Sequence, residues 1–404
     1  MTGAAHPIGQ EPETLEVRPG RVLLRIAQGE LGSLRVLIAL AVIWTVFAAL
    51  NDRFLTAVNL TNLMLQITAV GTISVGVVLV LLLGEIDLSV GAVSGLAAGV
   101  MAVLVTKHGW APELGIVAAL AVGCAIGAFN GVMVAAFRIP SFVVTLAGLL
   151  AWQGALLWVL GDTGTVNLRD STITDLTSTF FDGYIGWILA IGAIVLYVAT
   201  GWMGRQKRAR AGLQSGPLAA YVLRSVFVAA AVIAAMLILN ADRGLPLAVV
   251  ILVGLVVLFT FLTERLAWGR HVFATGGNAE AARRAGIRID RVRVSIFMLA
   301  STLAAAGGVL AASRLLAVNQ SSGSGDLLLL AIAGPVIAGT SLFGGRGYVA
   351  SALLGALVIG SVSNGMDLQG YDSDVKFMVY GAVLLAAVTI DAVTRRKRQQ
   401  TGRA

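Results

Sequence analysis

The sequence predicts an all-α polytopic membrane protein with about ten to twelve transmembrane helices, some of them glycine-broken or re-entrant. Three observations predict this fold class: 57% of the 404 residues are hydrophobic, only 12% are charged, and the mean hydropathy is +0.88. A soluble globular chain carries about 25% charged residues. Because a spanning helix needs about 20 apolar residues, the hydrophobic residues suffice for about eleven or twelve spans and leave no room for a large soluble domain.

Apolar runs separated by polar residues divide the chain into twelve predicted segments. They are residues 35–51, 62–83, 88–106, 112–136, 139–161, 184–203, 219–240, 246–264, 294–315, 327–343, 349–365 and 375–391. We expect a cytoplasmic tail at 1–34, a transmembrane domain at 35–393 with its longest cytoplasmic loop at 265–293, and a basic cytoplasmic tail at 394–404. The first residues lack the short, positively charged lead of a secretory signal, so the first segment is predicted to be a retained span.

The Lys and Arg residues orient these segments. With a cytoplasmic amino terminus, the inside segments hold 23 of the 29 basic residues and the outside segments hold six, whereas acidic residues divide into 10 inside and 11 outside. An asymmetry of Lys and Arg without one of Asp and Glu is the positive-inside pattern. It predicts that both termini are cytoplasmic, and it explains the net charge of +8 without nucleic acid as a partner.

The composition argues against an enzyme. Cys124 is the single cysteine, and His6, His108 and His271 have no metal-ligand spacing. None of the four lysines lies in a G-x-x-x-x-G-K-[ST] loop, and the chain has no G-x-S-x-G motif. We therefore expect a chain that binds no metal or cofactor itself and carries no catalytic constellation.

Two carboxylates interrupt the apolar sequence in the stretch GEIDLSVG, residues 84–91. A charge at membrane depth costs about 2.5 to 3.5 kcal/mol, so the interruption needs a structural reason. One interpretation is a tight cytoplasmic turn in which Asp87 caps the next helix. A second is a broken helix in which Glu85, Asp87 and Ser89 line a transport pathway. A third is a proton or sodium site at Glu85 and Asp87.

A second break, GTSLFGGRG at residues 339–347, separates the tenth and eleventh apolar runs at a comparable place in the second half. Glycine-interrupted pairs in both halves are typical of repeated transporter architecture. A short hairpin between two helices is the alternative interpretation.

The loop 265–293 contains a predicted short helix outside the membrane. Asn278 is a good N-cap, Glu280 favours the first turn, the Ala and Arg residues propagate a helix, and Gly286 can end it. The residues leave two roles open. The helix is either held at anionic headgroups by Arg283 and Arg284, or it docks a cytoplasmic partner.

Polar residues inside predicted spans are candidates for lining a pathway. Trp152 and Gln153 fall near the middle of the fifth span, where neither has an interfacial role. Core packing and a helix–helix hydrogen bond of about 0.6 kcal/mol would account for them. The alternative is a polar passage that they line together with Asn130 and Asn364, whose amides offer hydrogen bonds to a polar substrate.

Five stretches together resemble the permease subunits of bacterial carbohydrate-uptake ABC importers, the group that handles ribose, galactose, arabinose and xylose. They are EIDLSVG (85–91), IPSFVVTLAG (139–148), GGNAEAARRAGI (276–287), the run around 339–347, and NGM (364–366). The resemblance covers nearly all of the chain after residue 35. The basic stretch 205–210, followed by an added pair of spans, is similar to the longer xylose-type branch.

This resemblance implies a permease homodimer in the lipid of the bacterial inner membrane, two ATP-binding subunits below it and a periplasmic sugar-binding protein above it. ATP and Mg would be bound by the partner subunits, and a monosaccharide, xylose or a related pentose, would cross by alternating access. The resemblance also implies that the loop helix is a coupling helix fitting the ATPase. Its implied contact residues are Asn278, Glu280, Ala281, Ala282, Arg283 and Gly286.

The sequence departs from the family at residues 333–339, where Pro335 is expected to kink the tenth span. The leading hypothesis is a permease without covalent chemistry, powered by a separate ATPase. The alternative is an ion-coupled secondary transporter that uses Glu85 and Asp87 as its relay.

Overall fold

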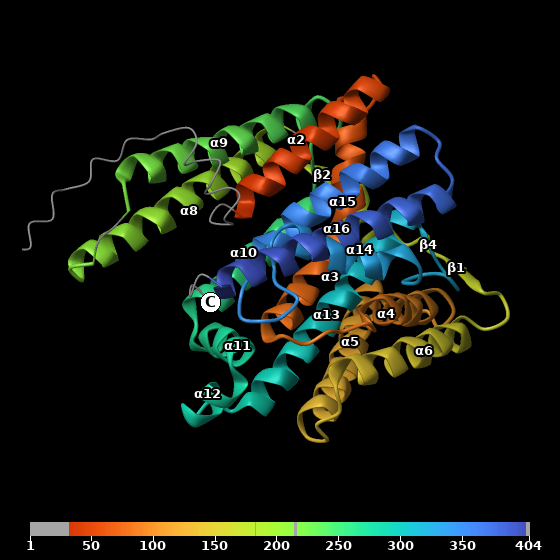
Figure 1. The fold of residues 1–404 in the computed structure, drawn as a ribbon. Helices are drawn as coiled ribbons and strands as arrows, with labels where there is room; N and C mark the ends of the chain where they lie inside the picture. The colour runs from red at the N-terminus through yellow and green to blue at the C-terminus, as the bar shows by residue number, and fades with distance from the viewer. Residues whose placement is uncertain (1–31, 182, 214–215, 401–404) are drawn as a thin grey trace, which may run out of the picture.

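The computed structural model describes residues 32–181, 183–213 and 216–400, and its architecture is a bundle of helices (Figure 1). The helices are α2 (Gly32–Leu50), α3 (Ala57–Leu83), α4 (Val90–Thr106), α5 (Pro112–Ala135), α6 (Ser141–Leu160), α7 (Ser171–Ser178), α8 (Gly183–Arg210), α9 (Leu218–Asn240), α10 (Leu247–Arg265), α11 (Ala267–Gly277), α12 (Ala279–Arg284), α13 (Ile289–Leu315), α14 (Asp326–Ile337), α15 (Ala350–Leu368) and α16 (Ser373–Gln400). The strands are β1 (Thr165–Asn167), β2 (Phe180–Phe181), β3 (Leu245–Pro246) and β4 (Ala317–Asn319).

Among the described residues, each of the twelve predicted segments overlaps a helix. In the part of the chain that the structure describes, eight helices are long and apolar enough to cross a membrane, and three shorter apolar helices lie at Val36–Leu50, Val90–Thr106 and Leu327–Ile337. Helix α16 covers the last predicted segment. The predicted all-α polytopic fold is confirmed.

Helix α13 lies at the centre of the bundle and packs closely on α5. Glycines at four-residue spacing on α5 make this approach possible, because small residues let helix backbones meet. A Cβ added to Gly127 would lie 2.2 Å from the carbonyl oxygen of Phe297, and one added to Gly123 would lie 2.6 Å from that of Ser301. Helix α3 packs beside them and buries most of its residues.

Helix α14 is shorter than the predicted span 327–343, because it ends at Ile337. Pro335 lies in its last turn, and the N–H of Thr340 donates a 2.9 Å hydrogen bond to the Pro335 carbonyl. Gly339 then turns the chain with φ +103°. The proline therefore marks the end of the helix instead of kinking a continuing span, and residues 338–349 form a loop.

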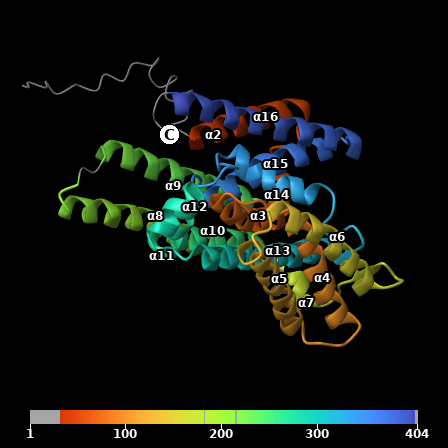
Figure 2. The same ribbon diagram turned by 60° about the horizontal axis from the view of Figure 1, so that its bottom comes forward.

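Helices α8 and α9 form a hairpin that projects from the bundle in both views (Figures 1 and 2). Its buried residues are Gly186 and Ala190 of α8 and Met236 and Leu239 of α9, all near the end where β2 pairs with β3. Strand β1 pairs antiparallel with β4 and places Val166 opposite Val318. These short pairings tie the connection between α6 and α8 to the rest of the bundle.

Candidate functional site

The two glycine-rich breaks meet in space. The N–H of Gly345 donates a 2.9 Å hydrogen bond to the carbonyl of Leu82, in the last turn of α3. Gly84 and Gly344 have φ angles of +81° and +82°, a region that favours glycine. A Cβ on Gly344 would lie 2.8 Å from the Cα of Gly84. Glycine is therefore needed in both breaks, because the backbone turns there with positive φ and because the two backbones approach each other closely.

The end of α11 joins the same contact. A Cβ added to Gly276 would lie 1.9 Å from the carbonyl oxygen of Leu82 and 2.8 Å from the nitrogen of Gly345. The neighbouring Gly277 has open space around the same position. The loop between α10 and α13 thus packs through its backbone at Gly276 against the backbone of both glycine-rich breaks.

Helix α12 has the local structure that the sequence predicts. The Oδ1 of Asn278 accepts a 3.0 Å hydrogen bond from the N–H of Ala281, and Gly286 follows the helix with φ +82°. Glu280 lies in the first turn and pairs across 3.7 Å with Arg283 on the exposed surface. The capped helix outside the bundle is therefore confirmed as a structural element.

Ala282 differs from the other residues of the implied coupling helix, because it faces the chain's own bundle. Ala282 is only 4% exposed, because α12 turns it toward this chain's own bundle, whereas Asn278, Glu280, Ala281, Arg283 and Gly286 are exposed. The methyl group of Ala282 packs against the chain's own residues, and its contact with a partner stays a prediction. The other five residues form what we call the α12 outer face.

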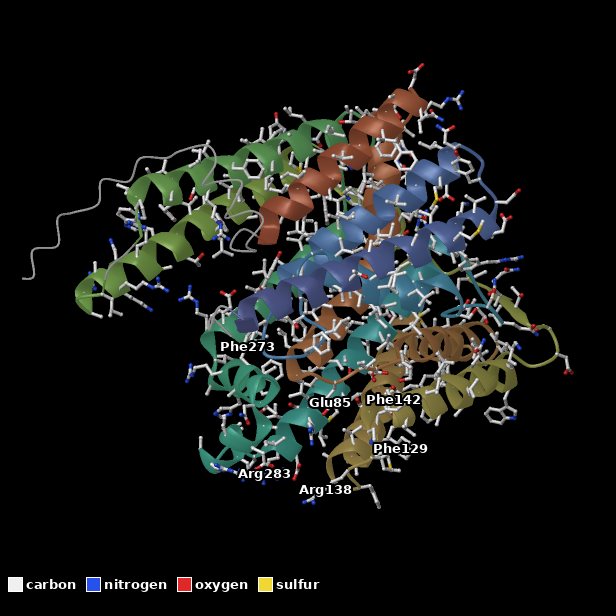
Figure 3. All side chains as sticks on the ribbon, in the orientation of Figure 1. Glu85, Phe129, Arg138, Phe142, Phe273 and Arg283 are labelled. Atoms are coloured by element: carbon white, nitrogen blue, oxygen red, sulfur yellow. The ribbon has the colours of Figure 1, made fainter. Side chains whose placement is uncertain are left out.

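Glu85 forms an ion pair that the sequence did not predict. Its Oε1 lies 3.0 Å from the Nε of Arg293 at the start of α13, and both side chains are partly buried. In the view of Figure 3, Glu85 is seen between the labelled Phe273 of α11 and Phe142 of α6. The pair connects the first break to the helix that follows the α12 loop. The cluster of seven arginines around this loop was the available signal, yet it did not single out Arg293.

The rest of the first break is pinned to the start of α6. The N–H of Ile86 donates to Ser141 Oγ at 3.2 Å, and the N–H of Leu88 donates to Thr145 Oγ1 at 3.0 Å. These hydroxyls satisfy backbone groups that a broken helix leaves unpaired. Ser141 and Thr145 stand four residues apart in the stretch IPSFVVTLAG, a spacing that places both on one helix face.

Asp87 closes a tight turn at the start of α4. Its Oδ1 accepts hydrogen bonds from the N–H of Ser89 at 2.8 Å and from Ser89 Oγ at 2.7 Å. The predicted turn and the position of this carboxylate near the helix start are therefore observed, although Asp87 stands outside the capping position, which is Ser89.

The same turn begins a chain of polar contacts into the bundle, which we call the α4 polar cluster: Asp87, Ser89, Asn130 and Trp152. Asn130 is buried and donates through Nδ2 to Ser89 Oγ at 3.2 Å. A Cβ on Gly148 would lie 2.9 Å from Trp152 Nε1 and 3.4 Å from Ser89 Cβ, so the indole nitrogen and Ser89 both approach Gly148. Trp152 also meets Phe129 edge to face at 6.2 Å.

Asn364, on α15, contacts the start of α3. Its amide exchanges two hydrogen bonds, of 2.8 and 3.0 Å, with the amide of Asn59 at the start of α3. Asn59 also donates to the carbonyl of Phe54. The buried Asn364 amide thus has its partner on α3, and a passage that it lines together with Asn130 stays a prediction. Gln153 follows Trp152 on α6 and is half-buried.

A family model described as "Branched-chain amino acid transport system / permease component" matches residues 59–388, which include both breaks, the α12 loop and the α4 polar cluster. The chain belongs to this permease family. The match extends from the first turn of α3 into α16, so nearly the whole described bundle of the permease lies within it.

Curated relatives of the permease include sugar transporters. This chain is 38% identical to the xylose transport system permease protein XylH of Escherichia coli (strain K12), over 86% of this chain and 88% of the relative. It is 36% identical to XylH of Haemophilus influenzae, over 90% and 96% of the two chains. The identity to the ribose import permease protein RbsC of Escherichia coli (strain K12) is 30%, over 88% and 92%. No solved structure matches the chain.

Proposed function

We propose that this chain is the membrane-spanning permease of an ATP-driven importer and carries a monosaccharide of the xylose type across a bacterial inner membrane. The observation that carries the proposal is the 36–38% identity to xylose permeases over nearly the full length of both chains. The permease itself performs no covalent chemistry. ATP and Mg would be bound and used by separate ATP-binding subunits.

The α12 outer face is the proposed docking surface for those subunits. It exposes small, acidic and basic residues on a capped helix, and the same loop rests on Leu82 and Gly345 through Gly276. A displacement of α12 would therefore act directly on the ends of both halves of the bundle. This arrangement supports a mechanical role for the loop over simple attachment to headgroups.

The α4 polar cluster, with Gln153 beside it, is the proposed part of the pathway. Asp87 Oδ2, Asn130 Oδ1 and Trp152 Nε1 are buried atoms with no hydrogen-bond partner among the described residues. Buried polar groups without partners are costly, and sugar hydroxyls can both donate and accept hydrogen bonds. A conformation that opens this cluster would offer a sugar two acceptors, a donor and an aromatic ring.

The remaining partners follow from the same proposal. A second permease copy, a periplasmic sugar-binding protein and the surrounding lipid would complete the importer, with both termini of the permease in the cytoplasm. The ion-coupled alternative would use Glu85 and Asp87 as its relay. Glu85 is already engaged by Arg293, which disfavours a relay that needs both carboxylates, whereas Asp87 gives only Oδ1 to Ser89 and keeps Oδ2 for the proposed pathway.

Substrate identity is tested by uptake of labelled sugars into vesicles that contain the permease, its ATP-binding subunits and its native binding protein. We expect xylose to be taken up faster than ribose or fructose, and unlabelled xylose to compete best. Preferential uptake of an unrelated solute, such as a branched-chain amino acid, would contradict the proposed substrate class.

A further inference from the structure

The α8–α9 hairpin has a charge distribution unlike the rest of the chain. Residues 183–241 contain five basic residues and no acidic residue. Four of the basic residues, Arg205, Lys207, Arg208 and Arg210, end α8, and Arg224 lies in the second turn of α9. All of them except the partly buried Arg205 are exposed. We call these five residues the hairpin basic end.

The dimensions of α8 place this basic end just outside the hydrocarbon. From Gly183 to Gly204 the helix is about 33 Å long at 1.5 Å per residue, close to the thickness of about 30 Å of the hydrocarbon core. The basic residues begin at the next position. Their side chains therefore reach the level of the lipid headgroups.

Aromatic side chains mark the same level. Trp202 and Tyr221 lie 6.2 Å apart between ring centroids, and the guanidinium carbon of Arg205 lies 5.5 Å from the ring centroid of Tyr221. The Tyr221 hydroxyl donates to the carbonyl of Val198 at 2.7 Å, which fixes α9 against α8. Trp and Tyr are typical of the membrane interface, next to the basic residues that extend beyond it.

This end of the hairpin has little cover from the bundle. The buried residues of both helices lie at the opposite end, near β2 and β3, and the hairpin projects away from the other helices (Figure 2). Around the outside, the exposed residues of this half include Val195, Leu196, Val222 and Leu223. Acyl chains match this apolar surface, and anionic headgroups match the charges above it.

We propose that the hairpin basic end is a binding site for anionic phospholipid. Successive crossings of the membrane by α8, α9 and α10 put this end on the same side of the membrane as α12, so the lipid would belong to that leaflet. A second copy of the chain, packed here about a two-fold axis, would bring two basic clusters together, which electrostatics disfavours. The inference rests on the membrane location of the chain and is independent of the transported substrate.

The test uses the purified full-length permease in detergent, titrated with phosphatidylglycerol or phosphatidylcholine of identical acyl chains and observed by native mass spectrometry. Phosphatidylglycerol should bind in preference to phosphatidylcholine. Each basic residue near an anionic surface contributes about 1 kcal/mol, or about fivefold in binding. The variant K207Q/R208Q/R210Q should therefore lose phosphatidylglycerol affinity by about tenfold or more, whereas the charge-preserving control K207R/R208K/R210K should retain it.

Several results would overturn the proposal. They are equal binding of the two lipids, unchanged phosphatidylglycerol affinity in the glutamine variant, and displacement of the lipid by millimolar inorganic phosphate, which would identify a free-anion site. A shift from dimer to monomer in the glutamine variant would instead show that a second copy covers this end. Equal melting temperatures of wild type and both variants in neutral lipid establish that the comparison concerns binding and not folding.

Discussion

The N–H of Gly345 donates a hydrogen bond to the carbonyl oxygen of Leu82, and Gly276 packs against both. Three segments that are distant in the sequence thus share one backbone contact: the end of α3, the loop after α14 and the end of α11. Force applied to the α11–α12 loop can reach both halves of the permease through this point. The mechanism we propose for energy coupling depends on it.

Gly276→Ala should damage the permease, and Gly277→Ala should not. A Cβ at Gly276 would fall 1.9 Å from the Leu82 oxygen, while the same atom at Gly277 meets open space. Forcing an atom into a packed contact costs about 1 to 3 kcal/mol. The melting temperature in detergent and the sugar-stimulated ATPase activity should both fall in Gly276→Ala and stay at wild-type level in Gly277→Ala. Equal values in the two variants would contradict the contact between Gly276 and Leu82.

Ala281→Asp should uncouple ATP hydrolysis from transport without unfolding the permease. The residue is exposed here, but a docked subunit would bury its charge, which costs several kcal/mol when unpaired. Ala282→Asp is the matched comparison, because that charge would be buried inside the permease itself and should lower the melting temperature. Wild-type coupling in Ala281→Asp would remove the α12 outer face from the docking surface.

Labelling of single cysteines tests the orientation, in a Cys124→Ala background. Thr172 on α7 and Ala281 on α12 are both exposed in the folded chain. An impermeant thiol reagent added outside intact cells should modify Thr172→Cys and leave Ala281→Cys unmodified, because the basic residues predict that α12 is cytoplasmic. The reverse pattern would place the α12 loop on the wrong side for an ATPase.

Substitutions on α6 test the α4 polar cluster. Trp152→Ala and Gln153→Leu should each lower the rate of sugar uptake by about three- to tenfold, the worth of one lost hydrogen bond, while membrane insertion and binding-protein affinity stay intact. Trp158→Ala is the control on the same helix, since this indole is 84% exposed at the bundle surface. Unchanged uptake in both test variants would assign Trp152 and Gln153 to packing.

Much of this permease could be predicted from its sequence because the bilayer imposes simple rules. Hydrophobic length placed each of the twelve predicted segments on a helix of the described chain, and Asn278 and Gly286 correctly bounded α12. The end of α14 was less predictable, because the chain beyond Pro335 remains apolar through Phe343 while the backbone has already turned. Hydropathy carries no information about such a turn.

Long-range partners could not be predicted. The sequence marked Glu85 and Asn364 as unusual polar residues, but nothing local identified Arg293 or Asn59 as their partners. Ala282 illustrates the same limit on a smaller scale, since which side of a short helix faces the bundle depends on how α11 and α13 hold it. Such contacts are properties of the tertiary packing.

The most direct test of the central claim is the energy source for xylose uptake. The initial rate is measured in proteoliposomes that contain the permease, its ATP-binding subunits and its native binding protein, with and without ATP, and with and without an ionophore that collapses proton and sodium gradients. We predict uptake that requires ATP and persists with the ionophore. Uptake that proceeds without ATP and stops with the ionophore would contradict the claim and establish ion-coupled transport.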